Sequence, residues 1–398
     1  TQTLEDAPVI GDYTDSGRLI TLENLTISTT DDEDNTNEFE EYSPAAPAVI
    51  ASSVEVVSSN FIGNTGGAIF SYGSATISGS SFVDNGNSLA YMSPGAIWTY
   101  GNLSILGSTF IDNSSLLGGA VRANAAEGSQ TLVTIQNSTF TGNSALLGGA
   151  IYANEFDGSS SPEVSIKNST FVDNSVTGED AEGGAIFATE GEILFSTFVN
   201  NEAPPQGEGA DIPGNSIYKT GYGTLILGAS IFAGRSELPQ LGVGGTLTPL
   251  FDLGGNVFST TEEGDLGDID QTSVFDKDLL SLFGTNTPTL ATHLPNTSGT
   301  QTIGLIETSP ARNIVFYEAP FDLVLLDQRG ASRAGPLADA GAFEGFIVPT
   351  TNPASTTTPT LAKTGSDAPW WLTISSAALM AAGGFISAVT ARRRRRSL

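Results

Sequence analysis

One stretch of sequence recurs six times between residues 54 and 212, and it constrains the fold more than any other feature. Each copy has a phenylalanine, with asparagine three residues later, serine two residues earlier and an aliphatic residue five residues earlier. Successive phenylalanines are 21, 28, 30, 31 and 27 residues apart. Such a period is typical of proteins in which each unit buries its apolar face only against its neighbours.

The aligned positions form four sets. The phenylalanines are Phe61, Phe82, Phe110, Phe140, Phe171 and Phe198. The asparagines are Asn64, Asn85, Asn113, Asn143, Asn174 and Asn201. The serines are Ser59, Ser80, Ser108, Ser138, Ser169 and Ser196, and the aliphatic residues are Val56, Ile77, Ile105, Ile135, Ile166 and Ile193. A Gly-Ala pair follows each copy, with its alanine at Ala68, Ala96, Ala120, Ala150, Ala185 and Ala210.

Apolar and polar residues alternate within each copy, as at Val164 and Ile166. This is the period of a strand and not of a helix. Several short strands per copy predict coils that stack about 4.8 Å apart, and the crossover rule favours a right-handed coil. We therefore predict an all-β, right-handed parallel β-helix solenoid with a C-terminal capping region, followed by a flexible linker and a transmembrane tail.

All the aligned residue types except the serines have an expected role in such a solenoid. The phenylalanines and aliphatic residues should point inward and stack on their counterparts in neighbouring coils. The asparagines should lie at tight corners, because asparagine tolerates the left-handed conformation, and their stacked amides should form a ladder. Gly-Ala should leave room for the opposite phenylalanine, and the variable gaps should be loops along one edge.

The alternation of Phe-x-x-Asn with Gly-Gly-Ala-Ile, as at residues 171–174 and 183–186, resembles the repeat of the polymorphic outer-membrane protein family of surface adhesins. Similar repeats occur in pectin-lyase-like β-helices. The resemblance covers roughly residues 51–235. It implies a surface-exposed β-helix and extends only to the repeat, since those adhesins end in an outer-membrane barrel, which we do not expect here.

The N-terminal region adds two features. Residues 20–27 alternate like a repeat strand, with Ile27 in the phenylalanine position, and are predicted to be the first coil. Residues 31–41 hold seven acids in eleven residues, but without the ligand spacing of an EF-hand loop. We interpret this acidic loop as a solvated insertion. The chain begins at Thr1 without an apolar leader, so we expect any export signal to have been removed or to be missing.

Residues 225–345 resemble the choice-of-anchor Q domain, which closes bacterial β-helices. The resemblance rests on sequence around His293, Ser309, Asp327, Arg329 and Asp339, and it departs at residues 312–313. It implies C-terminal coils and a cap over the last coil. We assign residues 1–235 to the β-helix and 236–346 to this region. The charged residues of the region, which are Asp327, Arg329, Arg333, Asp339 and Glu344, are interpreted as a structural ion-pair network, and His293 as structural.

Residues 347–360 are rich in Pro and Thr and are predicted to be an extended linker. The segment 361–398 then combines a short motif, an apolar run of membrane length at 369–391 and five arginines at 392–396. The motif is Leu361, Ala362, Lys363, Thr364 and Gly365. This ordered trio resembles a Gram-positive sortase sorting signal of the Leu-Ala-x-Thr-Gly type, and a plain tail anchor is the alternative.

The resemblance implies that a sortase, specific for this motif class, cleaves after Thr364 and transfers it to a peptidoglycan precursor. The partners expected are therefore sortase, the precursor and, through the tail before cleavage, the membrane. The expected location is extracellular, on the cell wall of a Gram-positive bacterium.

Composition limits the remaining functions. The net charge is −29, which argues against nucleic acid as a partner. The chain has no Cys, and between residues 54 and 234 its basic residues are Arg122, Lys167 and Lys219 alone. We therefore predict no catalytic residues, no metal and no cofactor, and a non-catalytic adhesin or interaction scaffold with a host glycan or matrix ligand. A carbohydrate-active lyase or hydrolase, and a passive surface-coat spacer, remain the alternatives.

Overall fold

The computed structural model divides the chain into two compact units, Thr1–Val348 and Pro349–Leu398. All residues that it describes belong to the first. They are residues 10–11, 18–28, 46–87, 93–125, 128–155, 160–205, 212–234, 239–244, 250–260, 272–294, 296–316, 321–333 and 336–347. The acidic loop 31–41, the linker beyond residue 347 and the whole of 361–398 lie outside these residues.

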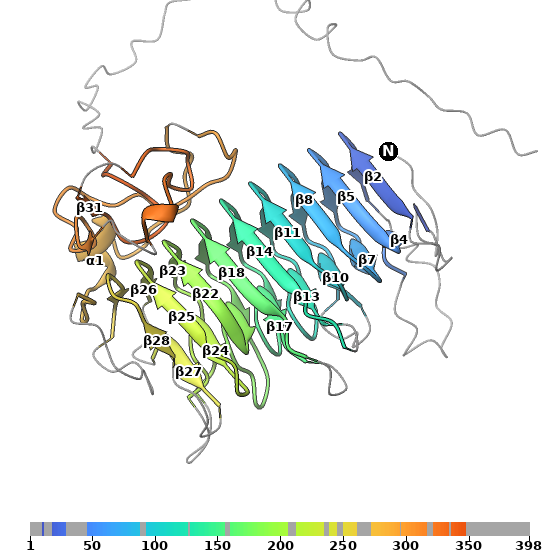
Figure 1. Ribbon diagram of the computed structural model, residues 1–398, viewed down its shortest axis with the longest axis horizontal. Helices are drawn as coiled ribbons and strands as arrows, with labels where there is room; N and C mark the ends of the chain where they lie inside the picture. Colours follow the sequence, from blue (N-terminus) through green and yellow to red (C-terminus); the bar gives the residue numbers. More distant parts are fainter. Residues whose placement is uncertain are drawn as a thin grey trace, which may run out of the picture. The chain divides into compact units, whose positions relative to one another are not determined.

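Three parallel sheets, each with nine strands, form a β-solenoid, and the chain visits them in turn on every coil (Figure 1). This confirms the predicted all-β parallel solenoid, while its right-handed sense stays a prediction. Sheet A consists of β1 (Ile10–Gly11), β4 (Val49–Ala51), β7 (Ile69–Ser71), β10 (Ile97–Thr99), β13 (Val121–Ala123), β17 (Ile151–Ala153), β21 (Ile186–Ala188), β24 (Ile217–Lys219) and β27 (Leu241–Val243).

The other two sheets follow the same order along the solenoid. Sheet B consists of β2 (Leu19–Glu23), β5 (Ser53–Val57), β8 (Ala75–Ser78), β11 (Leu103–Leu106), β14 (Leu132–Gln136), β18 (Glu163–Lys167), β22 (Glu190–Leu194), β25 (Leu225–Gly228) and β28 (Phe251–Asp252). Sheet C consists of β3 (Thr26–Ile27), β6 (Asn60–Ile62), β9 (Ser81–Val83), β12 (Thr109–Ile111), β15 (Thr139–Thr141), β19 (Thr170–Val172), β23 (Thr197–Val199), β26 (Ile231–Ala233) and β29 (Val257–Phe258).

The remaining described elements are short. The strands β16 (Ser144–Ala145) and β20 (Ser175–Val176) pair in parallel, and β30 (Val315–Phe316) pairs antiparallel with β31 (Leu337–Ala338). Helix α1 spans Leu279–Phe283, and a 3-10 turn spans Phe321–Leu323. Asp278 caps α1 by accepting from the Ser281 amide, and Gly284 ends it in the left-handed conformation. Among the described residues, no helix is long and apolar enough to cross a membrane.

The interior of the solenoid is filled by the aligned apolar residues. The six phenylalanine rings are fully buried and stack nearly parallel, with centroids 4.7–4.8 Å apart. The stack continues through Phe232 and Phe258 to Phe275, and Ile27 pairs with Phe61 at its other end. Because each strand is only a few residues long, each coil is stabilised by its two neighbours rather than by contacts of its own.

The last Gly-Ala pair of the alignment was placed in the wrong register. Strand β21 pairs with β24, so Ile186 lies beside Ile217. The amide of Ala185 donates to the carbonyl of Ser216, and that of Gly184 to the carbonyl of Gly214. The sixth equivalent of the alanine is therefore Ser216 and not Ala210, because the insertion after Asn201 is longer than the alignment assumed.

The expected left-handed asparagines also need correction. The ladder asparagines are absent from the described residues with positive φ. The preceding residue takes that conformation instead, at Gly63, Asp84, Asp112, Gly142, Asp173 and Asn200. Gly, Asp and Asn are the residue types that adopt it at least cost. The corner and the ladder are therefore two adjacent positions with separate requirements.

We refer to the described residues between 278 and 347 as the covering segment. The predicted cap should close the last coil, and Phe275 does extend the interior stack there. The covering segment, however, lies on the outer face of sheet C, beside β23 and β26 (Figure 1). It forms a second hydrophobic core with outward residues of that sheet, including Val172, Val199 and Ile231.

Candidate functional sites

The six predicted ladder asparagines form one buried column between sheets C and A. In the first five, Nδ2 donates to the Oδ1 of the asparagine one coil further on, at 2.6–2.9 Å. In the middle of the column, Asn143 donates to Asn174 at 2.9 Å and to the carbonyl of Phe110 at 3.1 Å. Its Oδ1 accepts from both the amide and the Nδ2 of Asn113. The Asn143 side chain is fully used within the protein, and all six asparagines are buried, so the column serves to stabilise the coils.

A serine ladder runs beside it, for which the sequence alignment assigned no role. The amide of each aligned serine donates to the Oγ of the next, at 3.1–3.3 Å. Each Oγ in turn donates to the carbonyl two residues earlier, as Ser138 does to Gln136 at 2.8 Å. The column extends beyond the repeat through Ser230 and Asn256. Its signal was present in the sequence as an invariant polar residue between two apolar positions.

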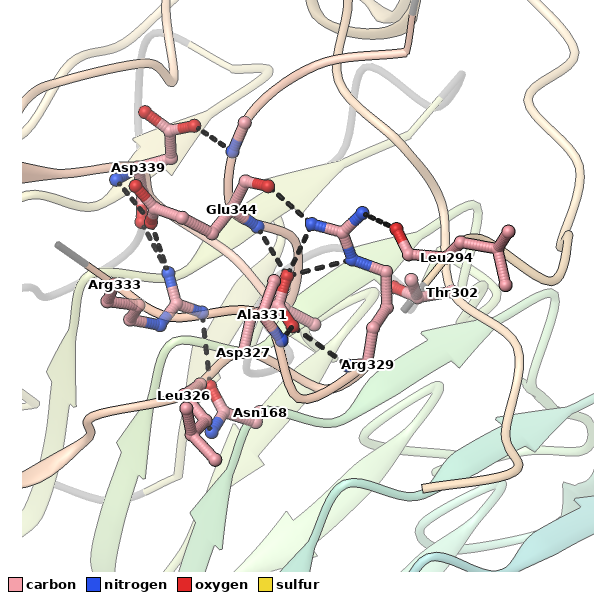
Figure 2. Close-up of polar contacts among 12 residues, drawn as sticks. Asn168, Leu294, Thr302, Leu326, Asp327, Arg329, Ala331, Arg333, Asp339 and Glu344 are labelled. Atoms are coloured by element: carbon pink, nitrogen blue, oxygen red, sulfur yellow. Dashed lines mark hydrogen bonds and ion pairs between the residues drawn. The ribbon is translucent and has the colours of Figure 1, made fainter. Parts of the chain in front are cut away.

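The predicted ion pairs of the covering segment form a buried network (Figure 2). Asp327 accepts from the Arg329 side chain at 2.6 and 2.8 Å, and from the amides of Ala331 and Glu344. Arg329 also donates to the carbonyl oxygens of Leu294 and Glu344. Its guanidinium lies 3.6 Å from the centre of the Phe343 ring. These contacts tie three separate stretches of the covering segment together.

Arg333 connects this network to the solenoid. It donates to Glu344 Oε2 at 3.0 Å, to the carbonyl of Gly341 at 2.7 Å and to Asn168 Oδ1 at 3.1 Å. Its guanidinium lies 4.0 Å from the centre of the Phe195 ring. Asn168 and Phe195 belong to the corners that precede β19 and β23. The arginine therefore fastens the covering segment to two successive coils.

Burial perturbs the titration of this network. It lowers the pKa of Arg333 and raises the pKa of Glu344, although each group attracts the charged form of the other. Burial, and then the charge of Arg329, lower the pKa of His293, whose ring makes an edge contact with Phe343. The acids and arginines contact each other and backbone groups, which is the pattern of a structural network.

The three basic residues of the coils are separated from one another. Lys167 pairs with Glu192 at 2.7 Å on sheet B. Arg122 is fully buried on sheet A, 3.9 Å from the Trp98 ring centre. Lys219 is also fully buried, and burial lowers its pKa. Within the described ranges, no group of three or more His, Cys, Asp or Glu residues could hold a metal ion.

A polar groove runs along the corner between sheets A and B. It comprises two adjoining hollows of about 400 and 370 Å³ that share Gln130, Glu163 and Glu190. The first also includes Asn102 and Ser161. Glu163 and Glu190 lie in register on β18 and β22, so their side chains leave adjacent coils on the same face. No site residue was predicted here, because the connections between these strands differ in length and sequence from coil to coil.

An aromatic cluster lies on the outer face of sheet A at the same corner. Phe70 and Trp98 pair in register on β7 and β10, with ring centroids 4.9 Å apart. Tyr72 contacts Phe70 edge-on at 4.8 Å, and Tyr100 lies 5.6 Å from Trp98. Trp98 is buried whereas Tyr72 is 59% exposed. The tryptophan therefore supports the tyrosines and does not itself face solvent.

The comparison with known proteins gives one partial match. A model of the Chlamydia polymorphic membrane protein (Chlamydia_PMP) repeat matches residues 137–154. This stretch holds most of one copy of the repeat, including Ser138, Phe140, Asn143 and Ala150. No curated protein matches the chain. The matched repeat and the parallel β-helix together support an outer surface protein of the adhesin type.

The predicted sortase residues, Leu361, Ala362, Lys363, Thr364 and Gly365, all lie outside the described residues. Chlamydia is Gram-negative, so the family match supports a surface location without supporting a Gram-positive wall. Anchoring at residues 361–365 therefore stays a prediction from the sequence.

Proposed function

We propose that this chain is a non-catalytic surface adhesin or interaction scaffold. The observation that carries the proposal is a β-helix built from the polymorphic-membrane-protein type of repeat, whose inward groups are used for stacking and ladders. A solenoid of this kind presents a long lateral surface relative to its core. Ligand contacts would lie on that outer surface and on the corner connections, where sequence varies between coils.

The second part of the proposal is covalent attachment to peptidoglycan by a sortase. Its support is the order of residues 361–365, the apolar run and the five arginines. The sortase thiolate would attack the carbonyl carbon of Thr364, and the peptide bond to Gly365 would break with the Gly365 amine as leaving group. An amine of the peptidoglycan precursor would then displace the thiol and form a new amide with Thr364.

Cell fractionation of two variants tests the attachment. Thr364→Ala should keep the chain in the membrane with its tail intact and remove it from the wall fraction. Lys363→Ala is the matched control, because the motif tolerates any residue at that position, and it should reach the wall as the parent chain does. Muralytic digestion of the parent should release a C-terminal peptide that ends at Thr364 joined to a cross-bridge amine. Intact residues 392–398 on the mature surface protein would instead show a plain tail anchor.

The absence of catalysis is tested separately on the full chain. Incubation with polyuronates and neutral polysaccharides, with and without calcium, should give neither reducing ends nor unsaturated uronate absorbance. Turnover that is lost on Lys167→Ala or Arg122→Ala would establish a lyase or hydrolase and overturn the non-catalytic assignment.

A further inference from the structure

The corner between sheets A and B combines three features that the structural role of the coils does not require. These are an exposed aromatic ledge, an elongated hollow lined by hydrogen-bonding groups, and an excess of carboxylates over cations in that hollow. We propose that this corner binds a neutral oligosaccharide. The inference rests on the proposed adhesin function and assigns its binding surface and ligand class.

The aromatic ledge consists of Tyr72 and Tyr100. The rings of Phe70 and Trp98 pack against them. Phe70 contacts both tyrosines edge-on, at 4.8 and 6.1 Å. Trp98 is fixed on its other side by Arg122 and by a 3.0 Å hydrogen bond from its Nε1 to Asn124. A ring held in this way loses little conformational entropy when it binds. Its face matches the apolar C–H face of a pyranose, which is how aromatic side chains with a polar tip serve in recognition.

The ledge leads into the polar groove. Tyr100 and Asn102 lie two residues apart in the three-residue connection between β10 and β11, so their Cα atoms are at most about 7 Å apart. Asn102 accepts from the amide of Leu132 at 2.9 Å, which fixes its side chain at the first hollow. From there Gln130, Glu163 and Glu190 continue the lining along the solenoid axis.

The groove matches a chain molecule rather than a compact ligand. Coils follow one another at about 4.8 Å, close to the length of one pyranose unit, so successive sugars would lie beside successive coils. Amides supply both donors and acceptors, and carboxylates accept strongly from sugar hydroxyls. This alternation of one apolar face and many hydroxyl partners is what an oligosaccharide requires.

The charge of the groove excludes acidic glycans. The described residues that line the two hollows include Glu163, Glu190 and Glu192 and no cationic side chain. Lys167 pairs with Glu192, and the charge of Lys219 interacts with that of Glu190. Three carboxylates against two nearby cations still leave the groove negative, so uronates or sialic acids placed here would be repelled. A lysine-rich peptide would satisfy the charge but would leave the aromatic ledge unexplained, so the neutral glycan is favoured.

Calorimetric titration of the full-length chain tests the proposal with defined probes. These are neutral hexamers of β-1,4-linked glucose, mannose and N-acetylglucosamine, a galacturonate hexamer and hexalysine. At least one neutral hexamer should bind with Kd below about 1 mM, and the galacturonate hexamer should not. Binding only of hexalysine or of galacturonate, or of no probe, would overturn the proposal.

Variants locate the site. Tyr72→Ala with Tyr100→Ala should weaken binding of the neutral hexamer at least about tenfold. Phe316→Ala is the matched control, because Phe316 is equally exposed, at 59%, but lies on β30 of the covering segment. It should bind unchanged, and equal losses in both variants would contradict the assignment. Since the tail is not involved, wall attachment should persist in the tyrosine variant, so failure of the glycan proposal and failure of the anchoring proposal are distinguishable.

Discussion

The two largest hydrophobic cores of the described residues differ in how they are assembled. The interior core of the solenoid stacks one residue from each coil in every column, so its contacts join residues about one repeat apart. The outer core, between sheet C and the covering segment, joins residues far apart in sequence. Gln328 accepts from Thr170, 158 residues away, and Arg333 bonds Asn168, 165 residues away.

This difference determines how each core responds to a destabilising substitution. In the interior, a substituted residue has members of its column in the coils on both sides, so neighbouring coils retain most of their contacts. The outer core depends on a single buried network, in which Arg333 and Asp327 each satisfy several groups at once. Removal of one charge there leaves others buried without a partner. A change in the interior should therefore be local, whereas a change in the network should release the covering segment as a unit.

The largest effect is expected for Arg333→Met. The variant fills similar space but leaves Glu344, Asn168 and two carbonyl groups without their donor. The free energy of unfolding should fall by about 3–5 kcal/mol, as measured by urea denaturation. Limited proteolysis should then cut within residues 278–347 while the coils persist.

Arg312→Met is the control for this prediction. Arg312 also approaches a buried acid, Asp339, but at 3.8 Å and with 21% of its side chain exposed. Its loss should cost less than about 1 kcal/mol. If the two variants were equally stable, the network would not be what holds the covering segment.

A smaller effect is expected inside the solenoid for Asn143→Leu. The change removes the side-chain donor to the Phe110 carbonyl and the acceptor of the buried Asn113 amide, at a cost of about 1–3 kcal/mol. Asn60→Leu, on the exposed outer face of β6, should cost less than about 0.5 kcal/mol. The proteolytic pattern of the covering segment should not change in either variant, which separates the two cores. Cleavage of the segment in Asn143→Leu would remove the distinction.

The interior of the solenoid can be predicted from the sequence because the physical requirements of its positions repeat from coil to coil. Phenylalanine at one register and serine and asparagine at two others have the same neighbours in coil after coil, so the alignment alone places them on one wall. The alignment failed where the chain departs from its period. After Asn201 a longer insertion moved the next strand to Ile217, and a local Gly-Ala pair at residues 209–210 took its place in the alignment.

The outer core could not be predicted from periodicity. Thr109, Thr139 and Thr170 occupy the same register on β12, β15 and β19, and nothing in their local sequence separates the first from the last. Yet Thr170 is buried beneath the covering segment, and Thr109 is not. The burial of each threonine depends on contact with residues beyond 290, and no periodicity links those residues to the repeat. The charged residues of the covering segment could be assigned to an ion-pair network from their types alone. The solenoid residues that they contact could not be predicted.

The register shared by Thr109 and Thr170 provides a matched pair of substitutions. Thr170→Val removes hydrogen bonds to Gln328 at 2.6 Å and to Thr302 at 2.8 Å. It should cost about 1 kcal/mol in the free energy of unfolding. Thr109→Val, which makes the same chemical change at a half-buried position of the same register, should stay within about 0.5 kcal/mol of the parent. Equal effects would mean that the outer core contributes no stability at this position.

The smallest effect should appear only as a dependence on pH. The interior columns consist of phenylalanine, serine and asparagine, which do not titrate, whereas the outer core contains Glu344, whose pKa is raised by burial. A raised pKa in the folded state means that the contribution of Glu344 is complete below its ordinary value of 4.5 and is lost as pH rises through the raised value. His293 acts in the opposite sense over this range, because its pKa is lowered by burial. The contribution of Glu344 is therefore measured as the difference between the parent and Glu344→Gln, in which the amide keeps a hydrogen-bond acceptor for Arg333 without a titrating group. Hydrogen exchange of the covering segment, corrected for its intrinsic pH dependence, should lose more protection between pH 4.5 and pH 7 in the parent than in the variant, and the interior amides should show no such difference. Equal pH dependence in the two proteins, or the same difference in the interior columns, would place the titrating group elsewhere and remove pH as a way to separate the two cores.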